Sequence, residues 1–232
     1  MCTLTYLPNT KNGRVITANR DESPSRKASV LSEYRNSNGI KYFIAKEPLR
    51  GGTNVAISPG KRMSVLLNGA FEPHRMGGEY LKSRGILLLE SLEFQDSFHL
   101  ADNTPFTGIE PFTLIDFQEN VKEIRWDGKK LHQKTIRQDI PHIWASAQLY
   151  SKDTLRKREL WFSELLQKSP DGEDVLKFHF EGGDGDPEND LVMNRDNLVR
   201  TVSITQMRER LGKGSIHHYD LLENQEQHIS FD

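Results

Sequence analysis

The stretch MCTLTYLPNTKNGRVITANRDE, residues 1–22, is the part of the sequence that specifies the fold most clearly. Residues 3–7 alternate as in a β-strand, Asn12-Gly13 is a dipeptide typical of hairpin turns, and residues 14–19 form a second strand pattern. We therefore expect a β-hairpin that brings Arg20 and Asp21 back toward the beginning of the chain. That beginning carries Cys2, the only cysteine in the sequence.

Cys2 directly follows the initiator methionine, and its side chain is small enough for that methionine to be trimmed. Trimming would leave one residue with a thiol, whose ordinary pKa is about 8.5, and an α-amine, whose ordinary pKa is about 7.7–8.0. A nucleophile and a general base would then share one residue. The alternative is an incidental cysteine at a frayed chain end.

Composition narrows the class of protein. A chain of 232 residues is long enough for one sizeable core, so we expect residues 1–232 to form a single domain. The net charge of −2 gives no reason to expect a nucleic acid or an anionic membrane as partner. The mean hydropathy is −0.65, and neither a membrane-spanning run nor a signal peptide is evident, so we expect a cytoplasmic protein.

The remainder of the chain mixes strand and helix patterns. Helical periodicity is expected over residues 79–92 and again over 151–167, where Ser151 is a plausible N-cap. Residues 22–38 and the acidic stretch 181–190 are expected to be loops. Strand patterns cover residues 42–45, 53–58, 63–67, 112–117, 121–126, 143–149, 199–205 and 215–222. This order predicts an α+β fold in which helices cover sheets.

A chain that opens Met-Cys-Thr and carries Ala-Asn-Arg-Asp-Glu at 18–22 resembles the NRDE family, also called the transport and Golgi organisation type. That family is similar to cysteine N-terminal nucleophile hydrolases such as choloylglycine hydrolase and penicillin V acylase. The resemblance implies a four-layer αββα fold and cleavage of non-peptide amide bonds. It extends to Gly51-Gly52-Thr53, to residues 66–68 and to residues 200–204.

The resemblance also implies roles for individual residues. Cys2 matches the nucleophile, and Arg20 and Asp21 match the pair that flanks it. Asn68 resembles the asparagine that donates to an oxyanion, and Arg200 resembles an arginine of the active site. A guanidinium near the thiol favours the thiolate, and an oriented amide donor stabilises an oxyanion. Substrate contacts are expected from Asn19, Thr53 and Ser146.

Ser146 stands where the family often has an asparagine, and this departure keeps a second function open. The first hypothesis is an amidohydrolase that acts on a small molecule with Cys2 as nucleophile. The second is a non-catalytic protein on the same fold that binds or transports a ligand such as a lipid or haem. A bland α+β domain with an incidental cysteine is a third alternative.

No cofactor and no metal site are expected. The acids between residues 184 and 190 lack the spacing of a calcium-binding loop, and the eight histidines lack metal-ligand spacing. The expected partner is a small-molecule substrate or ligand, and the sequence allows a homo-oligomer.

Overall fold

The computed structural model describes residues 3–11, 13–26, 29–74 and 80–231. The chain forms two compact units that alternate along the sequence. Unit 1 comprises Met1–Ala28, Asp139–Ala145 and Tyr150–Asp232, and unit 2 comprises Ser29–Gln138 and Ser146–Leu149. The prediction of one domain over residues 1–232 stays a prediction. Within the described residues, no helix has both the length and the apolar character needed to cross a bilayer.

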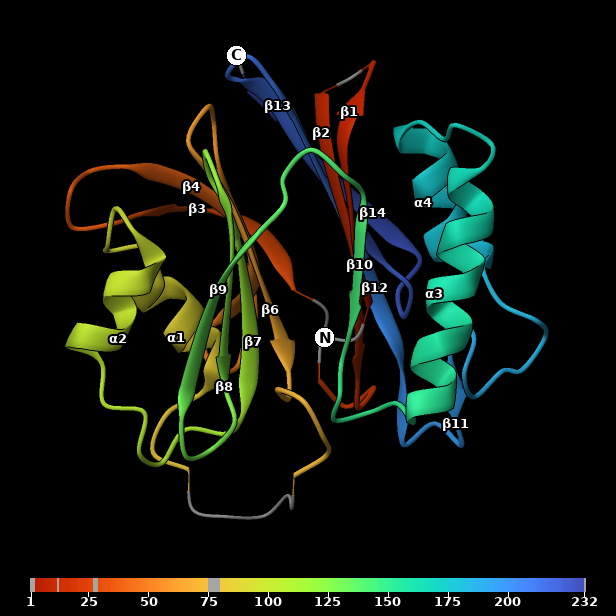
Figure 1. Cartoon of the computed structure of the whole chain (residues 1–232), viewed down its shortest axis with the longest axis horizontal. Helices are drawn as coiled ribbons and strands as arrows, with labels where there is room; N and C mark the ends of the chain where they lie inside the picture. Colours follow the sequence, from red (N-terminus) through yellow and green to blue (C-terminus); the bar gives the residue numbers. More distant parts are fainter. Residues whose placement is uncertain (1–2, 12, 27–28, 75–79, 232) are drawn as a thin grey trace. The chain divides into compact units, whose positions relative to one another are not determined.

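Unit 1 contains a seven-stranded antiparallel sheet with two helices, α3 and α4, beside it (Figure 1). The strand order is β10-β1-β2-β12-β13-β14, and β11 pairs with β12. The elements of unit 1 are β1 (Thr3–Thr10), β2 (Gly13–Glu22), β10 (His142–Ala145), α3 (Lys152–Leu166), α4 (Gly172–Glu181), β11 (Asn194–Arg195), β12 (Val199–Arg210), β13 (Lys213–Asp220) and β14 (Gln225–Phe231).

The predicted N-terminal hairpin is confirmed. Strands β1 and β2 pair in antiparallel register from Thr3 opposite Asn19 to Thr10 opposite Gly13. Strand β2 also pairs along its length with β12, so the second strand of the hairpin lies inside the sheet and not at its edge. The turn residue Asn12 lies outside the described residues.

The helices of unit 1 begin at residues that accept hydrogen bonds from the first turn. Ser151 caps α3 through the Thr154 amide, as predicted, and Asp171 caps α4 in a reciprocal pair with Asp174. Between the helices and the sheet lies an apolar cluster, and its buried members are Leu7, Val15, Phe162, Val175, Phe178 and Leu191. This packing fixes α3 and α4 on one face of the sheet.

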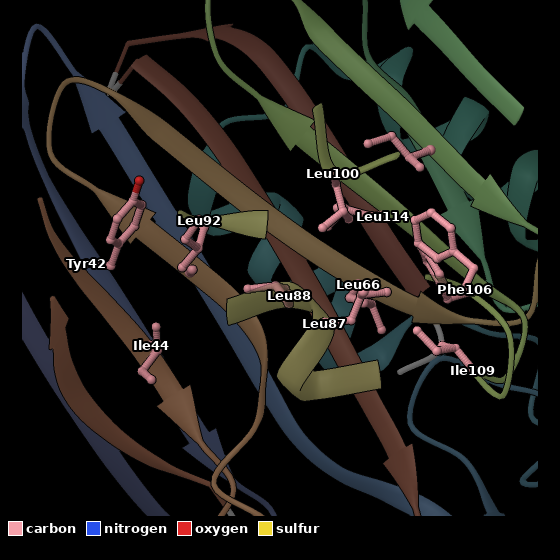
Figure 2. Packing of buried hydrophobic residues seen from close by; sticks show 13 residues of the cluster. Tyr42, Ile44, Leu66, Leu87, Leu88, Leu92, Leu100, Phe106, Ile109 and Leu114 are labelled. Atoms are coloured by element: carbon pink, nitrogen blue, oxygen red, sulfur yellow. The ribbon is translucent and has the colours of Figure 1, made fainter. Parts of the chain in front are cut away.

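Unit 2 contains a second antiparallel sheet, in the order β3-β4-β5-β6-β7-β8-β9. Its buried core lies around α1 and the strands beneath it, where Leu87 and Leu88 pack with Leu66 and Leu114 (Figure 2). The elements are β3 (Val30–Arg35), β4 (Lys41–Lys46), β5 (Thr53–Ser58), β6 (Arg62–Asn68), α1 (Arg84–Ser91), η1 (Ser97–His99), α2 (Leu100–Asn103), β7 (Phe112–Phe117), β8 (Val121–Trp126) and β9 (Leu131–Ile136).

Several local predictions were wrong. Strand β3 occupies part of the stretch 22–38 that was expected to be a loop, and the strand expected over 143–149 ends at Ala145. The helix expected over 79–92 is shorter, Arg84–Ser91. The buried stripe of α3 is Thr154, Arg158 and Phe162, whereas Leu160, which was expected to be on the apolar face, is 62% exposed.

Candidate active site

Strand alternation divides the residues of β2 between two faces of the sheet in unit 1. Asn19 and Asp21 point to the face that carries α3 and α4, because Asn19 contacts His179 of α4. Arg20 lies between them in sequence and therefore points to the opposite face. The predicted neighbours Arg20 and Asp21 thus act from different sides of one strand.

Both oxygens of the Asp21 carboxylate accept a hydrogen bond. The Thr201 hydroxyl donates to Oδ1 at 2.6 Å, and the Tyr150 hydroxyl donates to Oδ2. Asp21 is 2% exposed, and Tyr150 and Thr201 are also buried. A buried carboxylate held by two hydroxyl donors has a fixed orientation.

A β-bulge in β12 makes this arrangement possible. Thr201 lies opposite Asp21, but Ser203 and not Val202 lies opposite Arg20. Cross-strand partners share a face of a sheet, so the extra residue lets Thr201 point toward Asp21 while Ser203 faces the side of Arg20. The bulge therefore lies directly beside the predicted site residues Arg20 and Asp21.

Arg200 lies opposite Glu22 on β12, and strand alternation puts Glu22 on the same face as Arg20. Glu22 is engaged by Arg26 at 3.0 Å. The Arg200 guanidinium makes no hydrogen bond or ion pair to the described residues, and its Nε atom is buried. The two predicted arginines thus lie on one face of neighbouring strands.

Asn19 is wholly buried, and its amide is used inside unit 1. Its Nδ2 donates to the backbone oxygens of His179 and Leu191, at 3.2 and 2.6 Å, and its Oδ1 accepts from His179 Nδ1. Thr5 is 2.7 Å from the other ring nitrogen of His179, Nε2. Since Oδ1 can only accept, the ring carries a proton on Nδ1. Burial, and then the charge of Arg158, lower the pKa of His179 to about 3.

Sequence reasoning missed Arg158, whose side chain is 0% exposed in the middle of α3. Its Nη1 donates to the Thr3 hydroxyl, and its Nη2 donates to the backbone oxygens of Asn189 and Asp190 at 3.0 and 2.7 Å. Its guanidinium carbon lies 3.7 Å from the centre of the Tyr150 ring, in cation–π contact. The spacing 154, 158, 162 is a helical face, and an arginine in the centre of such a face was the available signal.

In unit 2, the structure brings Asn68 and Ser146 together. The Ser146 hydroxyl donates to the Asn68 backbone oxygen at 2.7 Å, and Ser146 is 1% exposed. Gly69 follows with φ of +82°, and a Cβ atom there would lie 2.9 Å from the backbone nitrogen of Gln148. Among the described residues the Asn68 side-chain amide makes no hydrogen bond, and the residue is half-buried. This amide is therefore available as a donor.

Thr53 begins β5 and Asn68 ends β6, so they lie at the same end of an antiparallel strand pair. The Thr53 hydroxyl is buried within hydrogen-bond distance of the backbone oxygens of Ala45 and Val55, at 2.9 and 2.7 Å. The substrate contacts expected from Asn19, Thr53 and Ser146 stay predictions. The polar atoms of all three side chains are engaged inside their own units.

Cys2 lies outside the described residues, so its role also stays a prediction. The acidic loop after α4 forms local contacts: Lys157 pairs with Asp184 at 2.7 Å, and Asp186 accepts from the Glu188 amide. No three His, Cys, Asp or Glu side chains in the described ranges gather as metal ligands would.

The fold of the chain is similar to that of solved structures named as an amidase, an acylase and a hydrolase. An N-acylethanolamine-hydrolyzing acid amidase ortholog from Caenorhabditis elegans has a TM-score of 0.57 at 13% identity, over 89% of this chain and 92% of that one. Penicillin V acylase from Agrobacterium tumefaciens has a TM-score of 0.56 at 12% identity, over 100% and 86%. A variant of conjugated bile acid hydrolase from Clostridium perfringens has a TM-score of 0.53 at 12% identity, over 99% and 92%.

These similarities confirm the predicted fold class, the α+β fold of N-terminal nucleophile hydrolases. No curated protein sequence matches the chain. A family model described as Transport and Golgi organisation 2 matches residues 1–211, which is most of the sequence. The chain therefore belongs to the transport and Golgi organisation 2 family.

Proposed function

We propose that the protein is an N-terminal cysteine amidohydrolase that cleaves the amide bond of a small molecule. The observation that carries the proposal is the register of β1, β2 and β12, on the fold shared with three amide hydrolases. Thr3 lies opposite Asn19, and Cys2 is one peptide unit, about 3.8 Å between Cα atoms, from Thr3. The nucleophile is thus joined to the strand beside Arg20 and Asp21.

The first half of the reaction forms an acyl-enzyme. After Met1 is removed, the Cys2 sulfur attacks the carbonyl carbon while its proton passes to the Cys2 α-amine. The carbonyl oxygen becomes an oxyanion, for which the family resemblance implies Asn68 as the side-chain donor. The C–N bond then breaks as the new ammonium returns the proton to the leaving nitrogen, so an amine departs and a thioester remains.

Hydrolysis of the thioester completes the cycle. Water attacks the thioester carbonyl, and the α-amine takes one water proton. The C–S bond breaks, sulfur recovers the proton, and a carboxylic acid is released. Arg20 and Arg200 favour the thiolate, and the Arg200 guanidinium, which has no partner among the described residues, is suited to an anionic group of the substrate.

Asn19, Thr53 and Ser146 receive supporting roles in this proposal. Their engaged side chains hold the neighbouring backbone, as Ser146 does for the Asn68 carbonyl. The expected asparagine donor is thereby replaced by a serine that faces the protein, and this observation favours the second candidate, a ligand-binding protein without catalysis. A cytoplasmic location and a homo-oligomer stay predictions.

Hydrolysis assays decide between the two candidates. The probes are an N-acylethanolamine, penicillin V and a conjugated bile acid, with amine release followed for the wild type, Cys2→Ser and the exposed control Arg156→Ala. We expect hydrolysis of at least one probe, a loss of about 10²-fold or more in Cys2→Ser, and wild-type rates in Arg156→Ala. Equal rates for wild type and Cys2→Ser would refute the enzyme.

The binding alternative makes a different prediction for thiol reactivity. In an enzyme, Cys2 should react with iodoacetamide much faster at neutral pH than a free thiol with a pKa of about 8.5. Because Cys2 is the only cysteine, the labelling rate reports this one group. A rate equal to that of a free thiol, together with no amide hydrolysis, would support ligand binding.

A further inference from the structure

We propose that Arg158 and Tyr150 are positioning residues for the Cys2 centre, holding Thr3 and Asp21 in place from the helix side of the sheet. The inference rests on the proposed function and adds two residues to it. It is carried by a chain of contacts that joins the first described residue of β1 to the carboxylate of β2.

The first step concerns Thr3. Its hydroxyl accepts from Arg158 Nη1, and the residue is wholly buried. The same guanidinium donates to the backbone oxygens of Asn189 and Asp190, so Thr3 is tied to α3 and to the loop after α4. Thr3, the residue that follows Cys2 in the sequence, is thus held in a fixed position.

The second step concerns Asp21. The Tyr150 hydroxyl donates to Oδ2 of Asp21, while the face of the Tyr150 ring is covered by Arg158 at 3.7 Å. Arg195 lies over the same ring at 5.5 Å. Tyr150 therefore has its ring held by cations and its hydroxyl aimed at the carboxylate.

The third step is energetic. A fully buried arginine is costly to desolvate, and an apolar side chain of similar volume often stabilises a core equally well. Arg158 makes no ion pair with the described residues. Its planar fork instead connects three separate segments, which an apolar side chain cannot do. The geometry thus indicates that Arg158 orients the site and does not chiefly stabilise the core.

On the helix side of the sheet, the charged and titratable groups of the network are Asp21 of β2, Tyr150, Arg158 of α3, His179 of α4 and Arg195 of β11. Arg20, Glu22 and Arg200 lie on the opposite face of β2 and β12. His179 stays neutral at neutral pH, because burial and the Arg158 charge lower its pKa.

Tyr150→Phe is the primary test, because it removes one hydroxyl and keeps the ring. We expect kcat to fall about tenfold, as for one lost hydrogen bond to a charged group, with KM changed less than about twofold. We also expect the apparent pKa of Cys2 alkylation by iodoacetamide to rise by about 0.5–1 unit, since a displaced Asp21 holds the α-ammonium less well. Arg158→Met should shift both readouts in the same direction, and Arg156→Ala, on the exposed face of α3, should shift neither.

A folded Tyr150→Phe with the wild-type alkylation profile and wild-type kcat would overturn the proposal. That result decides the matter even where Arg158→Met does not fold. The proposed function fails separately: a wild-type protein that hydrolyses no amide probe refutes the enzyme, while the pH profile of Cys2 alkylation in Tyr150→Phe still tests the positioning role.

Discussion

His179 makes the stability of unit 1 depend on pH. The ring is wholly buried, and each ring nitrogen has one neutral partner, Asn19 or Thr5. Its pKa is lowered to about 3, chiefly by burial, whereas the pKa of an unfolded histidine is about 6.5. Below pH 6.5, therefore, His179 is protonated in the unfolded chain but not in the folded protein. The unfolding free energy falls as the pH is lowered, until the pH reaches about 3.

The size of the effect follows from these two pKa values. Between about pH 7.5 and about pH 5, His179 alone removes about 2 kcal/mol of unfolding free energy. The variant His179→Gln keeps a donor for Asn19 and an acceptor for Thr5 but does not titrate. Its unfolding free energy should therefore fall by about 2 kcal/mol less than that of the wild type over the same pH interval.

Urea unfolding followed by the fluorescence of the three tryptophans measures this difference at both pH values. His99→Gln, at an exposed histidine, is the control for the substitution itself. The absolute stability of His179→Gln does not matter, because only its pH dependence is compared. Identical pH dependence in His179→Gln and wild type would refute the assignment of a buried, neutral histidine.

Two further predictions concern unit 2. Arg62 and Asp116 form an ion pair of 2.6 Å, with side chains 3% and 0% exposed, so Arg62→Ala should lower the unfolding free energy by about 3–5 kcal/mol. The control is the exposed ion pair of Arg156 and Asp153 on α3 in unit 1, which is 3.5 Å long. In urea unfolding, Arg156→Ala should lower the unfolding free energy by less than about 1 kcal/mol. Gly69→Ala should lower the unfolding free energy by about 1–2 kcal/mol because residue 69 has a left-handed backbone. The contact of the new side chain with the Gln148 backbone should lower it further. An unfolding free energy equal to that of the wild type would contradict the left-handed conformation of Gly69.

Local patterns were sufficient to predict the N-terminal hairpin. Asn12-Gly13 and the alternation on either side of it specify a register, and that register alone places Asp21 near the first residues of β1. The bulge in β12 could not be predicted, because it depends on how two strands far apart in sequence align. Thr201 was therefore not recognised as a partner of Asp21.

Strands with polar sequences were missed for a physical reason. Strand β3 lies at one edge of the sheet in unit 2, and β9 lies at the other. Edge strands are stabilised by backbone pairing on one side and carry polar residues that discourage further pairing. Alternation of apolar residues is weak in such strands, so residues 30–35 resembled a loop.

Arg158 was missed because the helical pattern was read from apolar residues alone. The apolar residues near it, such as Leu160 and Trp161, include positions that face solvent. The true buried face contains a threonine, an arginine and a phenylalanine, and the arginine donates through Nη1 and Nη2 to partners on β1 and on the loop after α4. Only tertiary structure reveals those partners.

The proposed chemistry requires that Cys2 carry a free α-amine beside its thiol. Intact-protein and N-terminal peptide mass spectrometry of the protein purified from its native host tests this requirement. We predict that the mature chain begins at Cys2. A chain that retains Met1 ahead of Cys2 would contradict the proposal, because the thiol would then lack the amine that is proposed to take its proton.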